Sequence, residues 1–212
     1  MRAAASPGRM EPTVETSPYD SLLPPGFAVD RRLPLGRHPI LTAFPGLDRL
    51  PLATRLEPDP EKRERLFSET CIDLVAEDLW MYVAPHAIPP GAPRDWHPRV
   101  VPGLDCIVVG EPHLRKSPLV TLYLDVFHEL CHVRQRRDGA NLFDRQTSYV
   151  RRWTEVDAYR FVVEEARQLG IPEDFLVDYL RVEWISSREH RELLEKLGVT
   201  ADKRARPGRA TD

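Results

Sequence analysis

Residues 119–137 read LVTLYLDVFHELCHVRQRR, and this stretch decides how the rest of the chain is interpreted. Ser117 and Pro118 come directly before it and are typical of a helix start, because serine can cap the first turn and proline fits into it. From Leu119 to Val133, apolar residues occupy nearly every side of such a helix. We therefore expect a buried helix that ends at about Arg137.

The centre of this helix carries an HExxH motif, His128-Glu129-Leu130-Cys131-His132. Residues four apart lie on one face of a helix, so both imidazoles can bind one metal ion while Glu129 projects beside it. Burial of these groups among Leu, Val and Phe is costly unless a metal satisfies them. The motif predicts Zn2+ bound by His128 and His132, with Glu129 as the catalytic base that activates a metal-bound water. Cys131 is expected to point away from the metal.

A third zinc ligand has two candidates, Asp138 and Glu155. Asp138 lies six residues after His132, but the pattern that uses this position needs a glycine where the chain has Gln135. Glu155 lies on the apolar stripe of the next predicted helix, where an acid requires a partner. We favour Glu155, and the competing interpretation is that it only neutralises an arginine at position 151 or 152.

Capping residues, prolines and apolar spacing predict the remaining elements. Asp59-Pro60-Glu61 is typical of a helix start, and this helix is expected to reach about Val83. Two β-branched runs around Pro102-Gly103 predict a hairpin, in which residues 104–109 form the better strand. Further helices are expected over three ranges: 148–169, 173–185 and 187–197. These elements predict an α+β fold in which a small sheet packs on the HExxH helix.

The predicted domain organisation follows from the distribution of the 21 prolines, which are crowded into the first half of the chain. Residues 1–58 are interpreted as a Pro-rich arm, partly disordered, because prolines interrupt helices. Its first 24 residues are expected to be disordered, and the remainder to lie irregularly against the domain through four apolar side chains: Phe27, Ile40, Phe44 and Leu47. Residues 59–200 are expected to form one domain, and 201–212 a flexible tail.

Composition excludes several classes of protein. A net charge of -3 provides no strong field for nucleic acid or an anionic membrane. No run of about 18 uncharged apolar residues is present to span a membrane. Three cysteines at irregular spacing, Cys71, Cys106 and Cys131, are not typical of a disulfide framework. We expect a cytoplasmic protein with reduced thiols, no nucleic-acid partner and no membrane partner; the sequence leaves its oligomeric state open.

HELCH followed by a helix that bears Glu155 resembles the gluzincin branch of the HExxH zinc metallopeptidases. The short spacing is similar to that of minimal gluzincins, including the ImmA/IrrE-like metallopeptidase domain, and the resemblance covers about residues 60–170. It implies a zincin-like fold in which His128, His132 and Glu155 bind zinc and Glu129 is the catalytic base. It also implies that strand 104–109 lines the cleft and can pair with an extended peptide substrate.

The chain departs from this family at two points. Many gluzincins carry an aspartate four positions after the glutamate ligand, where it orients a histidine, and this chain has Tyr159 there. Asp125 and Asp157 are the alternatives for that role. The donor to the substrate oxyanion is also open among four residues, each of which also has a structural or solvated interpretation: Tyr149, Tyr159, His97 and His113.

The function that these residues predict is hydrolysis of peptide bonds in a peptide or protein substrate by a zinc metallopeptidase. Two alternatives remain: a non-catalytic zinc-binding regulatory or interaction protein, and a zinc hydrolase of a non-peptide substrate. A closed site with four protein ligands would favour the first of these. The N-terminal arm is a candidate cover for the cleft.

Overall fold

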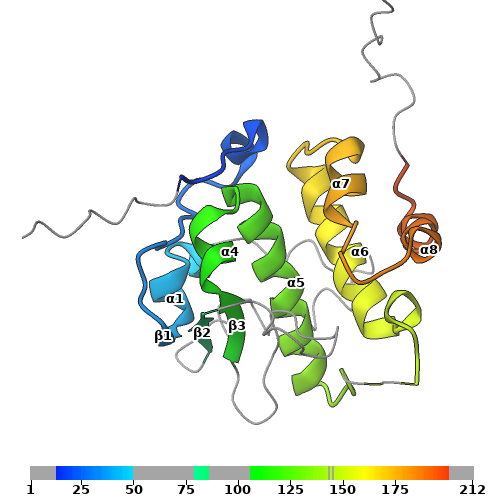
Figure 1. Ribbon diagram of the computed structural model, residues 1–212, viewed down its shortest axis with the longest axis horizontal. Helices are drawn as coiled ribbons and strands as arrows, with labels where there is room; N and C mark the ends of the chain where they lie inside the picture. The colour runs from blue at the N-terminus through cyan, green and yellow to red at the C-terminus, as the bar shows by residue number, and fades with distance from the viewer. Residues whose placement is uncertain (1–12, 50–78, 86–105, 143, 145, 201–212) are drawn as a thin grey trace, which may run out of the picture.

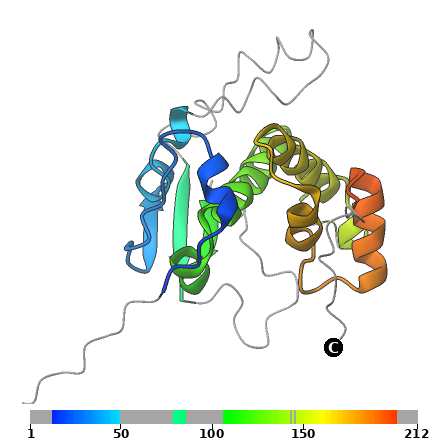
Figure 2. The same ribbon diagram turned by 90° about the horizontal axis from the view of Figure 1, so that it is seen from above.

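Helix α5, Leu119–Arg137, runs through the middle of the molecule, between a small sheet and a group of C-terminal helices (Figures 1 and 2). The computed structural model describes residues 13–49, 79–85, 106–142, 144 and 146–200. Within these residues the fold is a mixed α+β arrangement with a three-stranded sheet. The expected α+β class is therefore confirmed, and α5 matches the helix expected up to about Arg137.

The start of α5 is capped by the N-terminal segment. The backbone N–H of Val120 donates to Asp20 Oδ1 over 2.8 Å, which satisfies a donor that the helix itself leaves unpaired. Asp20 belongs to the short 3-10 helix Pro18–Leu22, which Ser17 caps. The expectation that residues 1–24 are disordered is wrong for residues 13–24, because this capping contact and the packing of Tyr19 on Phe175 hold the segment against the domain.

The sheet has the order β1-β2-β3, formed by β1 (Gly36–Pro39), β2 (Trp80–Ala84) and β3 (Cys106–Gly110). Strand β1 is antiparallel to β2, and β3 is parallel to β2. The short helices α1 (Ile40–Ala43) and α4 (Glu111–Lys116) follow β1 and β3. The prediction of an irregular arm over residues 25–58 is therefore wrong at β1, which joins the sheet, and at α1, which packs beside it.

The prediction of a helix that reaches Val83 is wrong at its end, where the structure has strand β2. Leu79, Met81 and Val83 are buried while Tyr82 is exposed, which is the two-residue alternation of a strand. Residues two apart cannot share a helix face, and Trp, Tyr and Val favour strands. The rest of that predicted helix lies outside the described residues.

The predicted hairpin around Pro102-Gly103 also lies outside the described residues. Its expected better strand, residues 104–109, corresponds to β3, which the structure begins at Cys106. This strand pairs in parallel with β2, with Trp80 opposite Cys106. Cys106 and Cys131 are free and buried. Cys71 lies among the residues that are not described.

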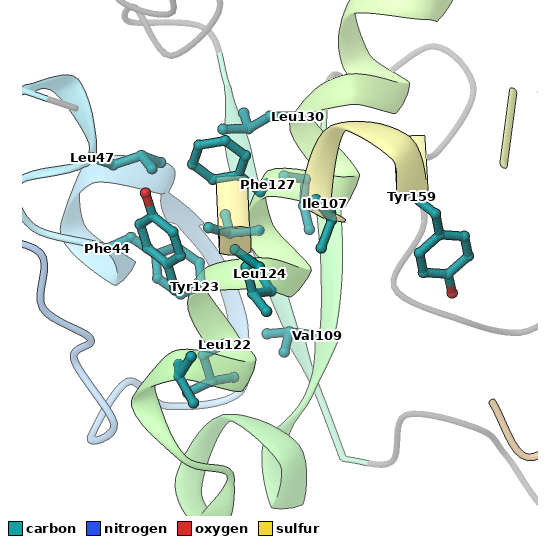
Figure 3. Close-up of a cluster of buried hydrophobic side chains, with 14 of the residues drawn as sticks. Phe44, Leu47, Ile107, Val109, Leu122, Tyr123, Leu124, Phe127, Leu130 and Tyr159 are labelled. Atoms are coloured by element: carbon teal, nitrogen blue, oxygen red, sulfur yellow. The ribbon is translucent and has the colours of Figure 1, made fainter. Parts of the chain in front are cut away.

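The hydrophobic core joins the sheet, the N-terminal segment, α5 and the C-terminal helices, and Figure 3 shows part of it. The four arm residues expected to pack against the domain are all buried: Phe27, Ile40, Phe44 and Leu47. They meet β3 and α5 in a cluster that includes Ile107, Val109, Tyr123, Leu124, Phe127 and Leu130. This packing fixes α5 against the sheet.

The C-terminal helices cover the other side of α5 (Figure 2). Helices α6 (Trp153–Gln168) and α8 (Ser187–Leu197) agree with the predicted ranges, and the short turn Tyr149–Arg151 precedes α6. Helix α7 ends at Tyr179 rather than at about residue 185. Of the helices described, none has the length and apolar character needed to cross a membrane.

Candidate metal centre

Three side chains meet at one point between α5 and α6. The Nε2 atoms of His128 and His132 lie 3.0 Å apart. Glu155 Oε2 lies 3.4 Å from His128 Nε2 and 3.3 Å from His132 Nε2. All three residues are buried, and together they form a group of the kind that can hold a metal ion. The structure thus brings together the three ligands predicted from the sequence.

The spacing of these atoms fits a zinc ion. Zinc binds imidazole nitrogen and carboxylate oxygen at about 2.0–2.2 Å, so tetrahedral neighbours lie about 3.3 Å apart. The distances of 3.0, 3.3 and 3.4 Å match that separation. Two imidazole nitrogens and a carboxylate oxygen form a suitable donor set, because zinc accepts both atom types. The residues present therefore fit the metal that the motif implies.

The backbone explains why the ligands converge. His128 and His132 are four residues apart on α5 and project from one face. Glu155 lies in the first turn of α6, which packs along that face. Its other oxygen, Oε1, accepts from Arg152 Nη1 over 3.3 Å. Glu155 can therefore pair with Arg152 and approach the histidines at the same time, because it uses a different oxygen for each.

The charges at this centre depend strongly on burial. Burial lowers the pKa of His128. It also acts to lower the pKa of His132, but the hydrogen bond and charge of Glu155 outweigh it and raise this pKa to about 9. Burial opposes ionisation of Glu155, yet the two histidines hold its pKa below the usual range. Without a metal, the cluster thus favours one proton held at His132, and a metal ion competes with that proton for the same atoms.

Glu129 lies beside the three ligand residues and outside their group. It is only 6% exposed, and burial raises its pKa to about 8. Within the described part of the chain, Glu129 Oε2 and His128 Nδ1 are buried side-chain atoms without a hydrogen-bond partner. A buried carboxyl with a pKa near neutrality can take up and release protons at physiological pH.

Two tyrosines border the centre. The ring of Tyr159 lies 4.3 Å from the ring of His128, between centroids, and the hydroxyls of Tyr149 and Tyr159 are 2.9 Å apart. Burial raises the pKa of both phenols, so both remain protonated. Of the four oxyanion-donor candidates, these two lie near the histidines; His97 is outside the described residues, and His113 faces elsewhere.

His113 and Asp125 form a separate pair. His113, on α4, lies 2.6 Å from Asp125 Oδ2 through its Nε2 atom. Tyr179 donates to the other oxygen of Asp125 over 2.9 Å. Asp125 is one turn before His128, but these contacts direct it away from the role of orienting that histidine. The interpretation of His113 as a solvated loop residue is wrong, because α4 holds it against α5.

A pocket of about 520 Å³ lies along α5. None of the three ligand residues lines it, but Asp125 does, one helical turn before His128. Its lining is aromatic and acidic: Tyr19, His113, Thr121, Asp125, Asp174, Phe175, Asp178 and Tyr179. The pocket therefore extends the ligand-bearing face of α5 towards α7 and the N-terminal segment.

Asp138 and Cys131, which were not favoured as metal ligands, lie where the sequence predicted. Asp138 follows the last residue of α5 and is exposed. Cys131 is buried and does not join the ligand group; burial raises the pKa of its thiol to about 12. Its sulfur lies near Gln135.

Gln135 is a residue near the centre that was not predicted from the sequence. It lies three residues after His132, and side chains at this spacing are neighbours on a helix, so the spacing could have identified it.

The chain was compared with protein-family models, curated proteins and solved structures, and no match was found in any of the three. The geometry of this centre is therefore the basis on which a function can be proposed.

Proposed function

We propose that the protein is a zinc-dependent metallopeptidase in which His128, His132 and Glu155 hold the zinc and Glu129 is the catalytic base. The observation that carries this proposal is the buried triangle of two imidazole nitrogens and one carboxylate oxygen, with sides of 3.0, 3.3 and 3.4 Å. Three protein ligands are typical of catalytic zinc sites, which keep one position open, whereas structural sites use four.

Bound zinc would supply a Lewis acid and would lower the pKa of water to about 7. Glu129 supplies the proton transfers. Its buried carboxyl has a pKa of about 8, close to the pH at which it must act. As a carboxylate it takes a proton from the attacking water, and as an acid it passes that proton to the leaving amine. The buried Oε2 atom, which has no partner among the described residues, is available for this transfer.

Tyr149 and Tyr159 are our candidates for stabilising the oxyanion of the substrate. Two hydroxyl groups supply two hydrogens, and the 2.9 Å bond between them uses one. The second hydrogen is free to be donated to a carbonyl oxygen as it becomes negative. Both phenols keep their protons because burial raises their pKa values. Such donors stabilise the transition state most when they are already oriented.

A peptide substrate is favoured over a small molecule by the position of β3. This strand ends the order β1-β2-β3, so within the described residues its outer edge pairs with no strand. An extended peptide can add to such an edge through backbone hydrogen bonds. The pocket beside Asp125 and Tyr179 is a candidate site for a substrate side chain.

The test begins with metal content, measured by elemental analysis on protein purified without added metal. We expect about one zinc per chain in the wild type and a marked loss in His128→Ala and Glu155→Ala. His38→Ala is the matched control, because His38 lies on β1 and hydrogen-bonds to Pro34. No zinc in the wild type, even after reconstitution, would contradict the proposed centre.

Activity is then measured on a library of unstructured peptides. We expect Glu129→Gln to bind zinc as the wild type does and to lose about 10²- to 10⁴-fold in turnover, the usual contribution of a general base. Glu195→Gln, on the exposed face of α8, is the control and should keep full activity. Zinc binding without peptide cleavage by the wild type would instead favour a regulatory zinc protein or a different substrate.

A further inference from the structure

The side-chain amide of Gln135 lies between α5 and the first turns of α6. Its Nε2 atom is 2.9 Å from the backbone oxygen of Thr154 and 3.0 Å from Asp157 Oδ2. A carbonyl oxygen and an ionised carboxylate only accept hydrogen bonds. The NH2 group of the amide must therefore face α6, and the amide oxygen must face the other way.

That amide oxygen sets the tautomer of His132. Gln135 Oε1 lies 2.9 Å from His132 Nδ1, and because an amide oxygen only accepts, Nδ1 must carry the hydrogen. A neutral imidazole that is protonated at Nδ1 has its lone pair at Nε2. This is the atom that lies 3.0 Å from His128 Nε2 and 3.3 Å from Glu155 Oε2. Gln135 thus presents the ligand atom of His132 in the form that a metal requires.

The same amide also holds the helix that supplies the third ligand. Thr154, whose backbone oxygen accepts from Gln135, directly precedes Glu155 in the first turn of α6. Asp157 is held in turn by Arg134 Nη2 over 3.3 Å. Gln135 itself is only 3% exposed, so water does not compete for these bonds. One buried amide therefore links a ligand on α5 to the segment that carries a ligand on α6.

We propose that Gln135, held by Asp157 and Thr154, is a positioning residue for metal binding. It fixes the His132 tautomer and the separation of His132 from Glu155. This proposal rests on the metal centre proposed above and assigns to Gln135 and Asp157 the orienting role that Tyr159, at the usual aspartate position, does not fill. Partners of this kind contribute about 10- to 100-fold to metal affinity.

The first experiment compares zinc affinity in the wild type and Gln135→Met by competition with a chromophoric chelator. Methionine keeps the length of the side chain but removes both its acceptor and its donors. We expect affinity to fall about 10- to 100-fold. Gln168→Met is the matched control, since Gln168 is exposed at the end of α6, and it should bind zinc as the wild type does.

A spectroscopic measurement separates orientation from general stability. In the zinc-loaded wild type, ¹H–¹⁵N NMR should show His132 with zinc on Nε2 and a slowly exchanging hydrogen on Nδ1. In zinc-loaded Gln135→Met, that hydrogen should exchange faster, because it has lost its acceptor. A loss of packing alone would not change this resonance selectively.

A charge-conserving double variant provides a rescue test. In Gln135→Glu/Asp157→Asn, the new carboxylate still accepts from His132 Nδ1, and the new amide can donate to that carboxylate. We expect zinc affinity above that of Gln135→Glu alone, in which two carboxylates oppose each other. If Gln135→Met is too unstable to purify, this comparison decides the matter.

The outcomes separate this proposal from the proposed metal centre. If the wild type binds zinc, but Gln135→Met binds it equally well and keeps the slow His132 resonance, Gln135 has no positioning role. If the double variant binds zinc no better than Gln135→Glu, the hydrogen-bond chain is also wrong. A wild type that binds no zinc would refute the metal centre itself.

Discussion

The two sides of α5 are both buried, but they differ in the interactions that their side chains make. On the sheet side, Leu130 is 3% exposed and packs among other apolar side chains (Figure 3). On the α6 side, His128 and His132 are 7% and 8% exposed and face Glu155. Burial alone therefore does not distinguish a core residue from a ligand. The difference is that the apolar side needs only close packing, whereas the polar side holds nitrogens that require a proton or a metal.

This comparison predicts two kinds of response to mutation. Changes on the sheet side should alter the free energy of unfolding to the same extent with and without zinc, because no atom there contacts the ligands. Changes on the α6 side should alter mainly the part of the stability that depends on zinc.

The largest loss of stability is expected for Leu130→Ala. Removal of a buried leucine costs about 2–5 kcal/mol, because it leaves a cavity in a packed core. Leu130 lies two residues after His128, so its side chain projects from the opposite side of α5. Urea unfolding of the wild type and the variant, each with excess zinc and with chelator, measures the difference. A loss that appeared only with zinc would contradict the separation of the two sides.

Zinc itself should stabilise the wild type by a comparable amount. A ligand that binds only the folded state at 100 to 1,000 times its dissociation constant adds about 2.7–4.1 kcal/mol. His132→Ala removes one of the proposed ligands, so zinc should barely change the thermal unfolding temperature of this variant. Trp153→Ala is the control, because Trp153 is exposed at the start of α6. An equal zinc response in His132→Ala would show that the metal binds elsewhere.

The smallest effect is expected at the pair of His113 and Asp125, which lies on the ligand-bearing side of α5 without being a ligand. Burial acts to lower the pKa of His113, but the hydrogen bond and charge of Asp125 outweigh it, and the net shift is upward. A raised pKa means that the protonated pair stabilises the fold fully below the unfolded pKa of about 6.5, and that this contribution disappears as the pH rises through the folded value.

His113→Gln should therefore destabilise the protein more at pH 5.5 than at pH 9.5. Both side chains are about one-third exposed, so solvent screening should keep the difference below about 1 kcal/mol. Urea unfolding in the absence of zinc at both pH values provides the measurement. A larger loss at the higher pH would mean that the neutral histidine, rather than the ion pair, supports the fold.

The sequence correctly predicted the elements that a local pattern of residues is sufficient to define. The HExxH spacing and the apolar surroundings of His128 define α5, and the structure agrees with its range. The apolar stripe around Glu155 correctly identified an acid that approaches the histidines. The predicted helix was wrong at Met81 and Val83, because apolar residues two apart are typical of a strand. Only the pairing with Pro39–Gly36 and with β3 shows that these residues form the central strand.

By itself, the sequence determined which residues of α5 share a face, because helical spacing is a property of consecutive residues. It also determined the chemical character of the donor set. Only the tertiary structure decided that Glu155 uses one oxygen for Arg152 and the other for the histidines. It also decided that Gln135 of α5, held by the first turns of α6, fixes the tautomer of His132. Those contacts depend on the angle and depth at which two helices pack, and that packing is set by the whole core rather than by any local spacing.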